Sequence, residues 1–376
     1  MDSAFFSIYA PKPIRNVLPK YGFPADVVEL KTNHLYSIRQ AQDIELSRDL
    51  RMAISEFAPG SEVIAAKQIW KSQGIRILPH RHPVPFAYTV CKKCQKFHYG
   101  TIPPICECGE TLKPKGEFIS PEDGFVAANR VSTTGEEPPK RIYASRVYFA
   151  NYNEEKALLN HETTEYAVEP ELRIPTSIRY SRYGWLAVVN DGYQRGFRIC
   201  MTCGWAEPIQ QQKVGNHENP ITNKPCRATL DTYHLGHRFM TDVLEIRLSG
   251  AQFLLRKSPA MYSLMYALLD GASEELGIRR NDIDGTLYYH QFNEPPSIII
   301  YDNVPGGAGH VERVKKNLRS VAETAFQKVD NCKCGKNTSC YNCLRNYNNQ
   351  YFHDELQRGY ALDILGLVLG KSVPNK

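Results

Sequence analysis

Eleven cysteines in three tight groups constrain this chain more than any other feature of its sequence. The last group, CKCGKNTSCYNC, contains Cys332, Cys334, Cys340 and Cys343. Four thiolates this close in sequence can converge on one tetrahedral zinc ion and leave no open position for water. The alternative is a redox dithiol, which needs an exposed thiol of low pKa at a helix N-terminus, and neither cysteine pair has that context. The spacing therefore predicts a closed structural zinc site.

The first group is a CxxC pair, Cys91 and Cys94, followed by a CxC pair, Cys106 and Cys108. Each pair resembles a knuckle whose turn points two sulfurs the same way, and the link between them is long enough for a short hairpin. This pattern predicts a zinc ribbon. Free cysteines buried in a core are the alternative.

The middle group supplies three thiols, Cys200, Cys203 and Cys226, so a four-coordinate zinc needs one more ligand. The candidates are His217, His234 and His237. We choose His217, because it lies between the thiols in a polar, turn-rich loop, whereas the other two directly precede an apolar strand. The cofactor prediction is therefore Zn²⁺, with one site at least and up to three.

The composition describes an ordinary folded chain of 376 residues, with 42% hydrophobic and 23% charged residues. No apolar run approaches the ~20 residues of a membrane-spanning helix, and the clustered cysteines are typical of a reducing compartment. We therefore expect a cytoplasmic protein without a membrane partner.

Hydrophobic periodicity predicts an α/β (α+β) fold, in which a mixed sheet has flanking helices and inserted zinc-binding ribbons. Residues 61–90 alternate as strands do, residues 296–302 form a buried strand, and helices are expected over 44–57, from Ser258 onward, after the glycines at 306–309, and over 354–369. The predicted division of the chain is a lead-in segment (1–60), a strand-rich zinc ribbon (61–120), a β-rich region with the second knuckle (121–250) and an α/β unit with the terminal cysteines (251–376).

Charge is unevenly distributed, although the formal net charge is only +6. No Asp or Glu occurs between Val63 and Cys106, and RYSRYGW combines arginines with aromatic rings. Such patterns are typical of phosphate-facing and base-stacking surfaces. The alternatives are a solvated basic face and an ordinary strand. The predicted nucleic-acid-binding residues are Lys67, Lys71, Arg76, Arg81, Lys92, Lys93, Lys96, Arg179, Arg182, Tyr183 and Trp185.

The segment YDNVPGGAGH, with Gly306, Gly307 and Gly309, is a possible phosphate turn, since glycines allow close backbone approach and a helix N-terminus follows. A tight turn without a ligand is the alternative. Asp302 and His310 lie beside it, but no second carboxylate has persuasive spacing, so we name no catalytic residue. The sequence also has no GxxxxGK[ST] loop and no DEAH-type box. Whether the chain is an enzyme stays open, and a non-catalytic module is favoured.

Three segments resemble a known family: LPKYGFPADVVEL with RDLRMAISEFAPGSEV, then DNVPGGAGH, then CKCGKNTSCYNCLRNYNNQYFHDELQRGYALDIL. Together they resemble the C-terminal domain of unknown function of DEAD/DEAH-box superfamily 2 helicases, which ends in the mitomycin-repair-helicase-like (MrfA-like) zinc-binding domain. The resemblance implies that the four terminal cysteines are zinc ligands, and it places Arg345, Asn348 and Arg358 in matching surroundings. The start resembles the junction that follows the second motor domain.

The resemblance implies an accessory module that binds or guides DNA beside a superfamily 2 helicase, in bacterial anti-phage defence or DNA repair. Without ATP-binding motifs, unwinding does not carry over to this chain. Two other hypotheses remain: a metal-dependent nuclease subunit with Asp302 near the scissile phosphate, and a protein–protein adaptor of a defence complex.

Overall fold

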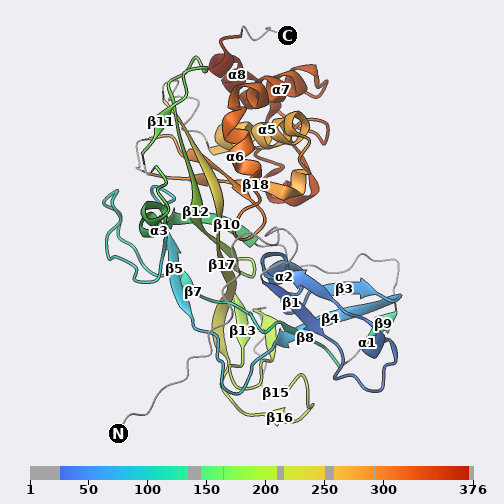
Figure 1. Ribbon diagram of the computed structural model, residues 1–376. Helices are drawn as coiled ribbons and strands as arrows, with labels where there is room; N and C mark the ends of the chain where they lie inside the picture. The colour runs from blue at the N-terminus through green and yellow to red at the C-terminus, as the bar shows by residue number, and fades with distance from the viewer. Residues whose placement is uncertain are drawn as a thin grey trace.

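The computed structural model describes residues 26–129, 131–133, 145–163, 165–209, 216–249, 258–290 and 294–371. Two sheets and one helical layer are arranged along an elongated molecule, with the helices at one end and the smaller sheet at the other (Figure 1). Within the described residues, none of the helices combines the length and the apolar character that crossing a membrane requires.

The smaller sheet is built from the N-terminal part of the described chain. Its strand order is β2-β1-β8-β4-β3, with β9 paired to β4: β1 (Val27–Lys31), β2 (Ser47–Asp49), β3 (Glu62–Ala65), β4 (Gln68–Ile75), β8 (Phe125–Ala127) and β9 (Ser132–Thr133). Two short helices accompany it, α1 (Gln40–Asp43) and α2 (Leu50–Glu56). The single helix expected over 44–57 is therefore wrong in its first half, where β2 pairs with β1 instead.

The large sheet follows the order β10-β12-β17-β7-β5-β6, with further short strands at its margins. Its main strands are β5 (Phe86–Val90), β6 (Phe97–Tyr99), β7 (Gly116–Ile119), β10 (Ser145–Tyr152), β12 (Thr176–Asn190) and β17 (Asp231–Leu248). The marginal strands are β11 (Ala167–Val168), β13 (Phe197–Ile199), β14 (Ala206–Pro208), β18 (Ile283–Tyr288) and β19 (Ser297–Asp302), while β15 (His217–Glu218) and β16 (Pro225–Cys226) form a separate hairpin. Helix α3 (Glu154–Leu159) follows β10.

The helical layer covers the β18–β19 end of the large sheet. It contains α5 (Ser258–Leu276), α6 (His310–Lys316), α7 (Leu318–Asn331) and α8 (Arg358–Leu369), with 3₁₀ segments η2 (Arg280–Asp282) and η3 (Tyr347–Phe352). The predicted buried strand is confirmed as β19, whose six residues are all buried. The last helix begins at Arg358 and not at Asp354, and the helix after the glycines is broken at Asn317 into α6 and α7.

The layered arrangement confirms the predicted mixed α+β fold with helices flanking a sheet. The large sheet takes strands from three of the four predicted segments, so those segments share one framework. The boundaries at 60, 120 and 250 stay predictions, and residues 1–25 of the lead-in segment lie outside the described residues.

Candidate metal centres and nucleic-acid interface

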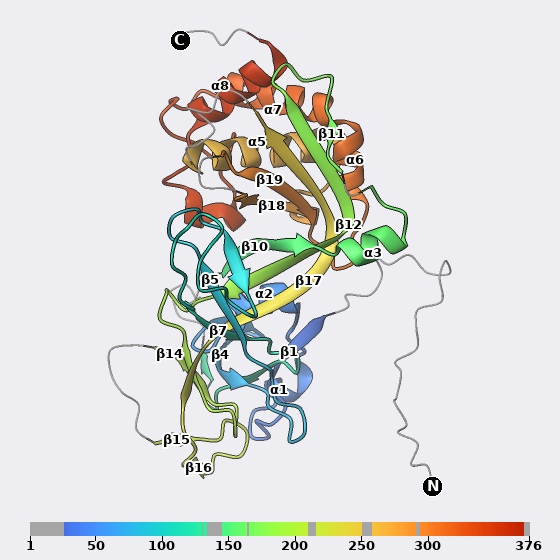
Figure 2. The same cartoon turned by 90° about the vertical axis from the view of Figure 1, so that its left-hand side faces the viewer.

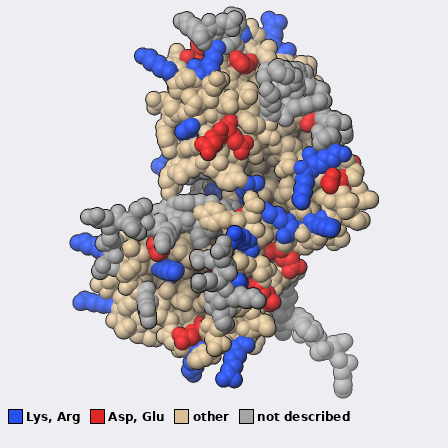
Figure 3. Space-filling model, turned by 180° about the vertical axis from the view of Figure 1, so that it is seen from behind, with Lys and Arg blue, Asp and Glu red and all other residues tan. Residues whose placement is uncertain are grey.

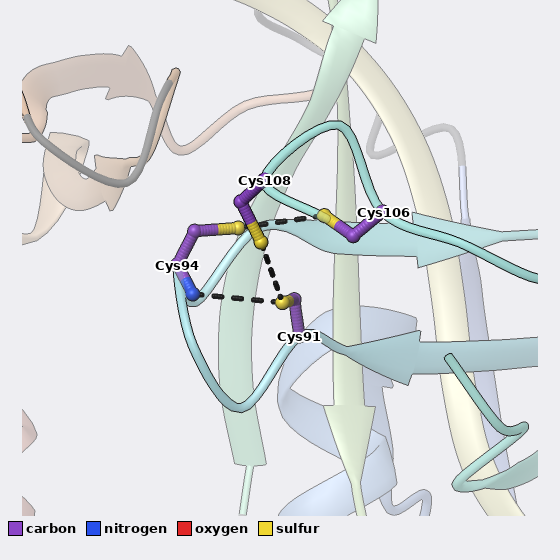
Figure 4. A group of neighbouring side chains, drawn as sticks. All are labelled: Cys91, Cys94, Cys106 and Cys108. Carbon is purple, nitrogen blue, oxygen red and sulfur yellow. Dashed lines mark hydrogen bonds between the residues drawn. The ribbon is translucent and has the colours of Figure 1, made fainter. Parts of the chain in front are cut away.

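The first cysteine group lies at the β5–β6 turn and in the loop that leads to β7, where its four sulfurs point toward one another (Figure 4). The Sγ atoms of Cys91 and Cys108 are 3.5 Å apart, as are those of Cys94 and Cys106. A disulfide would bring two sulfurs to ~2.05 Å, whereas thiolates on a tetrahedral zinc, each ~2.3 Å from the metal, lie about 3.8 Å from each other. The observed spacing therefore fits a metal site and not a disulfide.

The two CxxC turns share one backbone geometry. The N–H of Gln95 donates to the carbonyl of Cys91 at 2.9 Å, and the N–H of Gly204 donates to the carbonyl of Cys200 at 2.8 Å. Gln95 and Gly204 both have positive φ, 62° and 81°. This turn directs both sulfurs of a pair to one side, which is the geometry that a zinc knuckle needs.

The middle group joins Cys200, Cys203, His217 and Cys226, whose ligand atoms all lie within 4.8 Å of one another. His217 reaches the site because β15 and β16 pair it directly with Cys226. Its Nε2 is buried and has no hydrogen-bond partner among the described residues. Burial also lowers the pKa of His217, which keeps the imidazole neutral, the form that binds metals. An unsatisfied buried nitrogen beside three thiols fits a zinc ligand.

The two rival histidines are engaged elsewhere. The Nδ1 of His234 lies 2.6 Å from the hydroxyl of Tyr88, and the Nε2 of His237 lies 3.5 Å from the carboxylate of Asp26. Neither belongs to the four-ligand group.

The C-terminal group follows α7 directly, with Cys332 as the helix C-cap. The Sγ of Cys332 is 3.5 Å from that of Cys334 and 3.4 Å from that of Cys340, and the Sγ of Cys343 is 3.7 Å and 3.8 Å from those of Cys334 and Cys340. Burial raises the pKa of the Cys343 thiol. A thiolate there needs a compensating cation, and zinc would provide one.

Arg345 and Arg358, which were carried over from the family resemblance, donate hydrogen bonds to the segment that contains this group. Arg358 donates to the carbonyls of Cys334 at 3.0 Å and Val329 at 2.8 Å, and the Nε of Arg345 donates to Ser339 at 2.9 Å. Both side chains therefore fix the loop that carries the cysteines. Sequence spacing gave no sign of this role.

Two of the predicted phosphate-facing cations, Arg81 and Lys96, form ion pairs. Lys67, Lys71, Lys92 and Lys93 are exposed, and Arg76 is partly so. Arg81 is also exposed, but it lies 2.6 Å from Glu122 and 3.5 Å from Asp123, and Lys96 lies 2.7 Å from Glu107. The acidic partners come from beyond the acid-free stretch, so the sequence pattern overstates the free positive charge.

The RYSRYGW segment lies in β12 and is not one exposed surface. Arg179 is only 8% exposed and pairs with Glu154 at 2.8 Å, whereas Arg182 is 60% exposed and lies 3.7 Å from Glu312. Lys156 stacks over Tyr183 at 5.1 Å. Trp185 faces Arg238, whose guanidinium carbon is 5.1 Å from the ring centroid. Arg238 was missed in the sequence because its neighbours come from distant strands.

The glycine turn places Asp302 at the start of α6. The Asp302 carboxylate accepts the N–H groups of Ala308, His310 and Val311 at 2.5, 3.2 and 3.0 Å. Since these are the N–H groups that a phosphate would use, the carboxylate already fills that position. Asp302 is also fully buried, and burial raises its pKa.

A second carboxylate lies beside the turn. Asp242 is buried, and a Cβ on Gly307 would lie only 2.0 Å from its Oδ1, so this position admits only glycine. Burial, followed by the nearby charge of Asp302, raises the pKa of Asp242 to about 6. The hydroxyl of Tyr180 donates to Asp242 at 3.1 Å. The carboxylates of Asp242 and Asp302 are both buried inside the fold. Their position fits a packed turn better than a catalytic site.

Residues 264–344 match the MrfA Zn-binding domain family. The chain is 24% identical over 414 aligned residues to Druantia protein DruE of Escherichia coli (strain UMEA 4076-1), an alignment that covers 95% of this chain and 22% of that protein. The chain thus spans about a fifth of the length of this curated relative.

Solved structures of a DUF1998 helicase, MrfA, also match. The crystal structure bound to DNA matches with a TM-score of 0.40 and 12% identity, covering 91% of this chain and 33% of the helicase chain. The crystal structure bound to DNA and AMPPNP gives a TM-score of 0.33 and 12% identity, covering 86% and 29%.

The family match confirms the resemblance inferred from the terminal cysteines, since the chain carries an MrfA-like zinc-binding domain. Zinc as the cofactor, with up to three sites, is also confirmed by this match together with the three four-ligand groups.

Proposed function

We propose that this chain, which carries an MrfA-like zinc-binding domain at residues 264–344, is a helicase-associated accessory module that binds or guides DNA beside a superfamily 2 helicase. The single observation that carries the proposal is this domain match, extended by an alignment to DruE over 95% of the chain. We place the module in bacterial anti-phage defence or DNA repair and in the cytoplasm.

The proposal includes a specific assignment of the zinc ligands. We infer that each group binds one Zn²⁺ through its four members, whose ligand atoms lie within 4.8 Å of one another: Cys91, Cys94, Cys106 and Cys108; Cys200, Cys203, His217 and Cys226; Cys332, Cys334, Cys340 and Cys343. With four protein ligands, no coordination position is left for a substrate or an activated water. The zinc ions hold the fold and do not act as catalysts.

Exposed cations supply the chemistry for DNA binding. Lys92 and Lys93 project from the first zinc group, and Lys67 and Lys71 from the β3–β4 hairpin. Figure 3 shows Lys and Arg side chains gathered at the waist of the molecule, between the helical end and the smaller sheet. Contacts of this kind give affinity for the phosphate backbone that is independent of sequence and weakens with salt.

The test is a fluorescence-anisotropy titration of the purified zinc-loaded chain with labelled single-stranded and duplex DNA at two salt concentrations. Binding at micromolar concentration or tighter, weakening steeply with salt, is the expected result. Absence of binding at low salt, with co-purification of a helicase, would replace the proposal with a protein–protein adaptor. Metal analysis of the same sample should return close to three zinc ions per chain.

A further inference from the structure

A row of aromatic side chains and two arginines extends from the first zinc group to the C-terminal one. We call it the aromatic ladder, and its members come from β12, β17, β6, β10 and η3: Trp185, Arg238, Tyr99, Phe97, Tyr148, Arg146 and Tyr351. The two ends of the large sheet approach each other here, since the hydroxyl of Tyr99 on β6 lies 3.5 Å from Asn151 on β10. Figure 2 shows the β5 end of the sheet beside β10.

The first half of the ladder centres on Arg238. Its guanidinium carbon lies 4.6 Å from the ring centroid of Tyr99, 5.1 Å from that of Trp185 and 5.4 Å from that of Phe86. Tyr99 in turn stacks on Phe97 with centroids 5.9 Å apart. Phe97 and Tyr99 follow the knuckle of the first zinc group by only a few residues, so this half is anchored by that site.

The second half crosses to the C-terminal zinc motif. Phe97 stacks on Tyr148 with centroids 4.5 Å apart and planes inclined by 10°. Arg146 lies on the same face of β10 as Tyr148, and its guanidinium carbon is 4.5 Å from the ring centroid of Tyr351. Tyr351 lies in η3, which follows Cys343 closely.

Exposure is highest at the η3 end of the ladder. Phe97 in the middle is buried, whereas Tyr351 is 57% and its neighbour Tyr347 60% exposed. Trp185 and Tyr99 at the other end are partly exposed. Exposed rings next to an arginine resemble the surfaces on which unpaired bases stack.

Both arginines of the ladder are absent from the ion pairs of the described residues, unlike Arg81 and Arg179. Within the described ranges, no carboxylate lies within 4.0 Å of Arg146 or Arg238, whereas Arg81 and Arg179 both form ion pairs. The ladder therefore presents two cations that internal acids do not neutralise. An anionic strand with exposed bases complements both its charge and its rings.

We propose that the two ends of the aromatic ladder stack bases of a single DNA strand, with Tyr347 and Tyr351 at one end and Trp185 and Tyr99 at the other. The inference rests on the proposed function and narrows it to unpaired DNA, since bases within a duplex have no free face to stack on these rings. Arg146 and Arg238 face the phosphates of the bound strand.

The experiment compares two probes of equal length, an oligothymidylate and an abasic strand with the same phosphate backbone, on the zinc-loaded full chain. The substitution Tyr347→Ala with Tyr351→Ala should weaken oligothymidylate binding by about tenfold or more, because stacking is worth about 1–3 kcal/mol per base. Abasic binding should not change. The matched control, Tyr36→Ala with Tyr193→Ala, removes tyrosines that are 86% and 60% exposed and lie outside the ladder, and it should leave both affinities as they are.

Each outcome distinguishes the inference from the proposed function. If the chain binds neither probe, the proposed function fails. If it binds both equally and the tyrosine variant changes neither, or changes both alike, DNA binding stands and the ladder inference is overturned. Should the double variant lose zinc, Tyr351→Trp decides the question, because indole preserves stacking: retained oligothymidylate affinity supports the inference, and lost affinity with normal zinc content refutes it.

Discussion

The first and the C-terminal cysteine groups bring together the same four thiols but lie in different surroundings. Among the described residues, the cysteines of the first group share a small, separate hydrophobic cluster with Leu112 and Ile102. In the C-terminal group, Cys343 belongs to the largest hydrophobic core, together with α5, α7 and α8. Two zinc sites with the same four ligands can therefore contribute differently to the stability of the fold. The contribution depends on which part of the core the ligand loop holds in place.

The largest expected effect is at the C-terminal group. Cys343→Ser should leave the helical layer unfolded, since structural zinc sites contribute about 10–16 kcal/mol, as much as the whole stability of about 5–15 kcal/mol of an ordinary domain. Circular dichroism should show loss of helix, and zinc content should fall by at least one per chain. An unchanged melting curve would end the claim that this site supports the core.

The middle group should have an intermediate effect because it joins the two sheets. The N–H of Ile75 on β4 donates to the carbonyl of Gly204, next to Cys203, at 2.9 Å. His217→Ala should remove one zinc and increase hydrogen exchange at Ile75, while the helical layer stays protected.

The matched control for that prediction is His217→Cys, which replaces the nitrogen ligand with a thiolate. It should retain the zinc and the protection at Ile75. If both variants keep three zinc ions, His217 is not a ligand.

The first group should show only a local effect. Cys106→Ser should lose one zinc and expose the ribbon to protease, but the melting temperature of the rest should stay within about 3 °C. Cys106→Ser can be compared directly with Cys343→Ser, because each variant replaces one buried thiol by one hydroxyl. Equal loss of stability in the two variants would contradict the comparison.

The sequence predicted the local features well and the long-range ones poorly. The cysteine groups are visible because CxxC turns are short, and His217 could be chosen from its loop alone. Arg179 was assigned to nucleic acid, but α3 carries Glu154 back to pair with it. Arg238 has no local signature at all, because its three rings come from three other strands. Side-chain pairing across a curved sheet depends on tertiary packing, and no short pattern encodes it.

The smallest expected effect tests whether the two zinc groups also differ in contacting DNA. Lys92→Ala with Lys93→Ala removes exposed charge at the first group and should reduce the slope of log affinity against log salt by about 1.4 for a single strand, since each phosphate contact contributes about 0.7.

Lys333→Ala is the comparison at the C-terminal group, where a single exposed lysine lies between two of the cysteines. For Lys333→Ala we expect the slope of log affinity against log salt to change by at most about 0.7, the contribution of one phosphate contact. Anisotropy titrations over a salt series measure both slopes. If the Lys92 and Lys93 substitutions leave the slope unchanged while zinc content is normal, the first group is a structural ribbon only, and DNA contact has to come from the lysines of the β3–β4 hairpin or from the aromatic ladder.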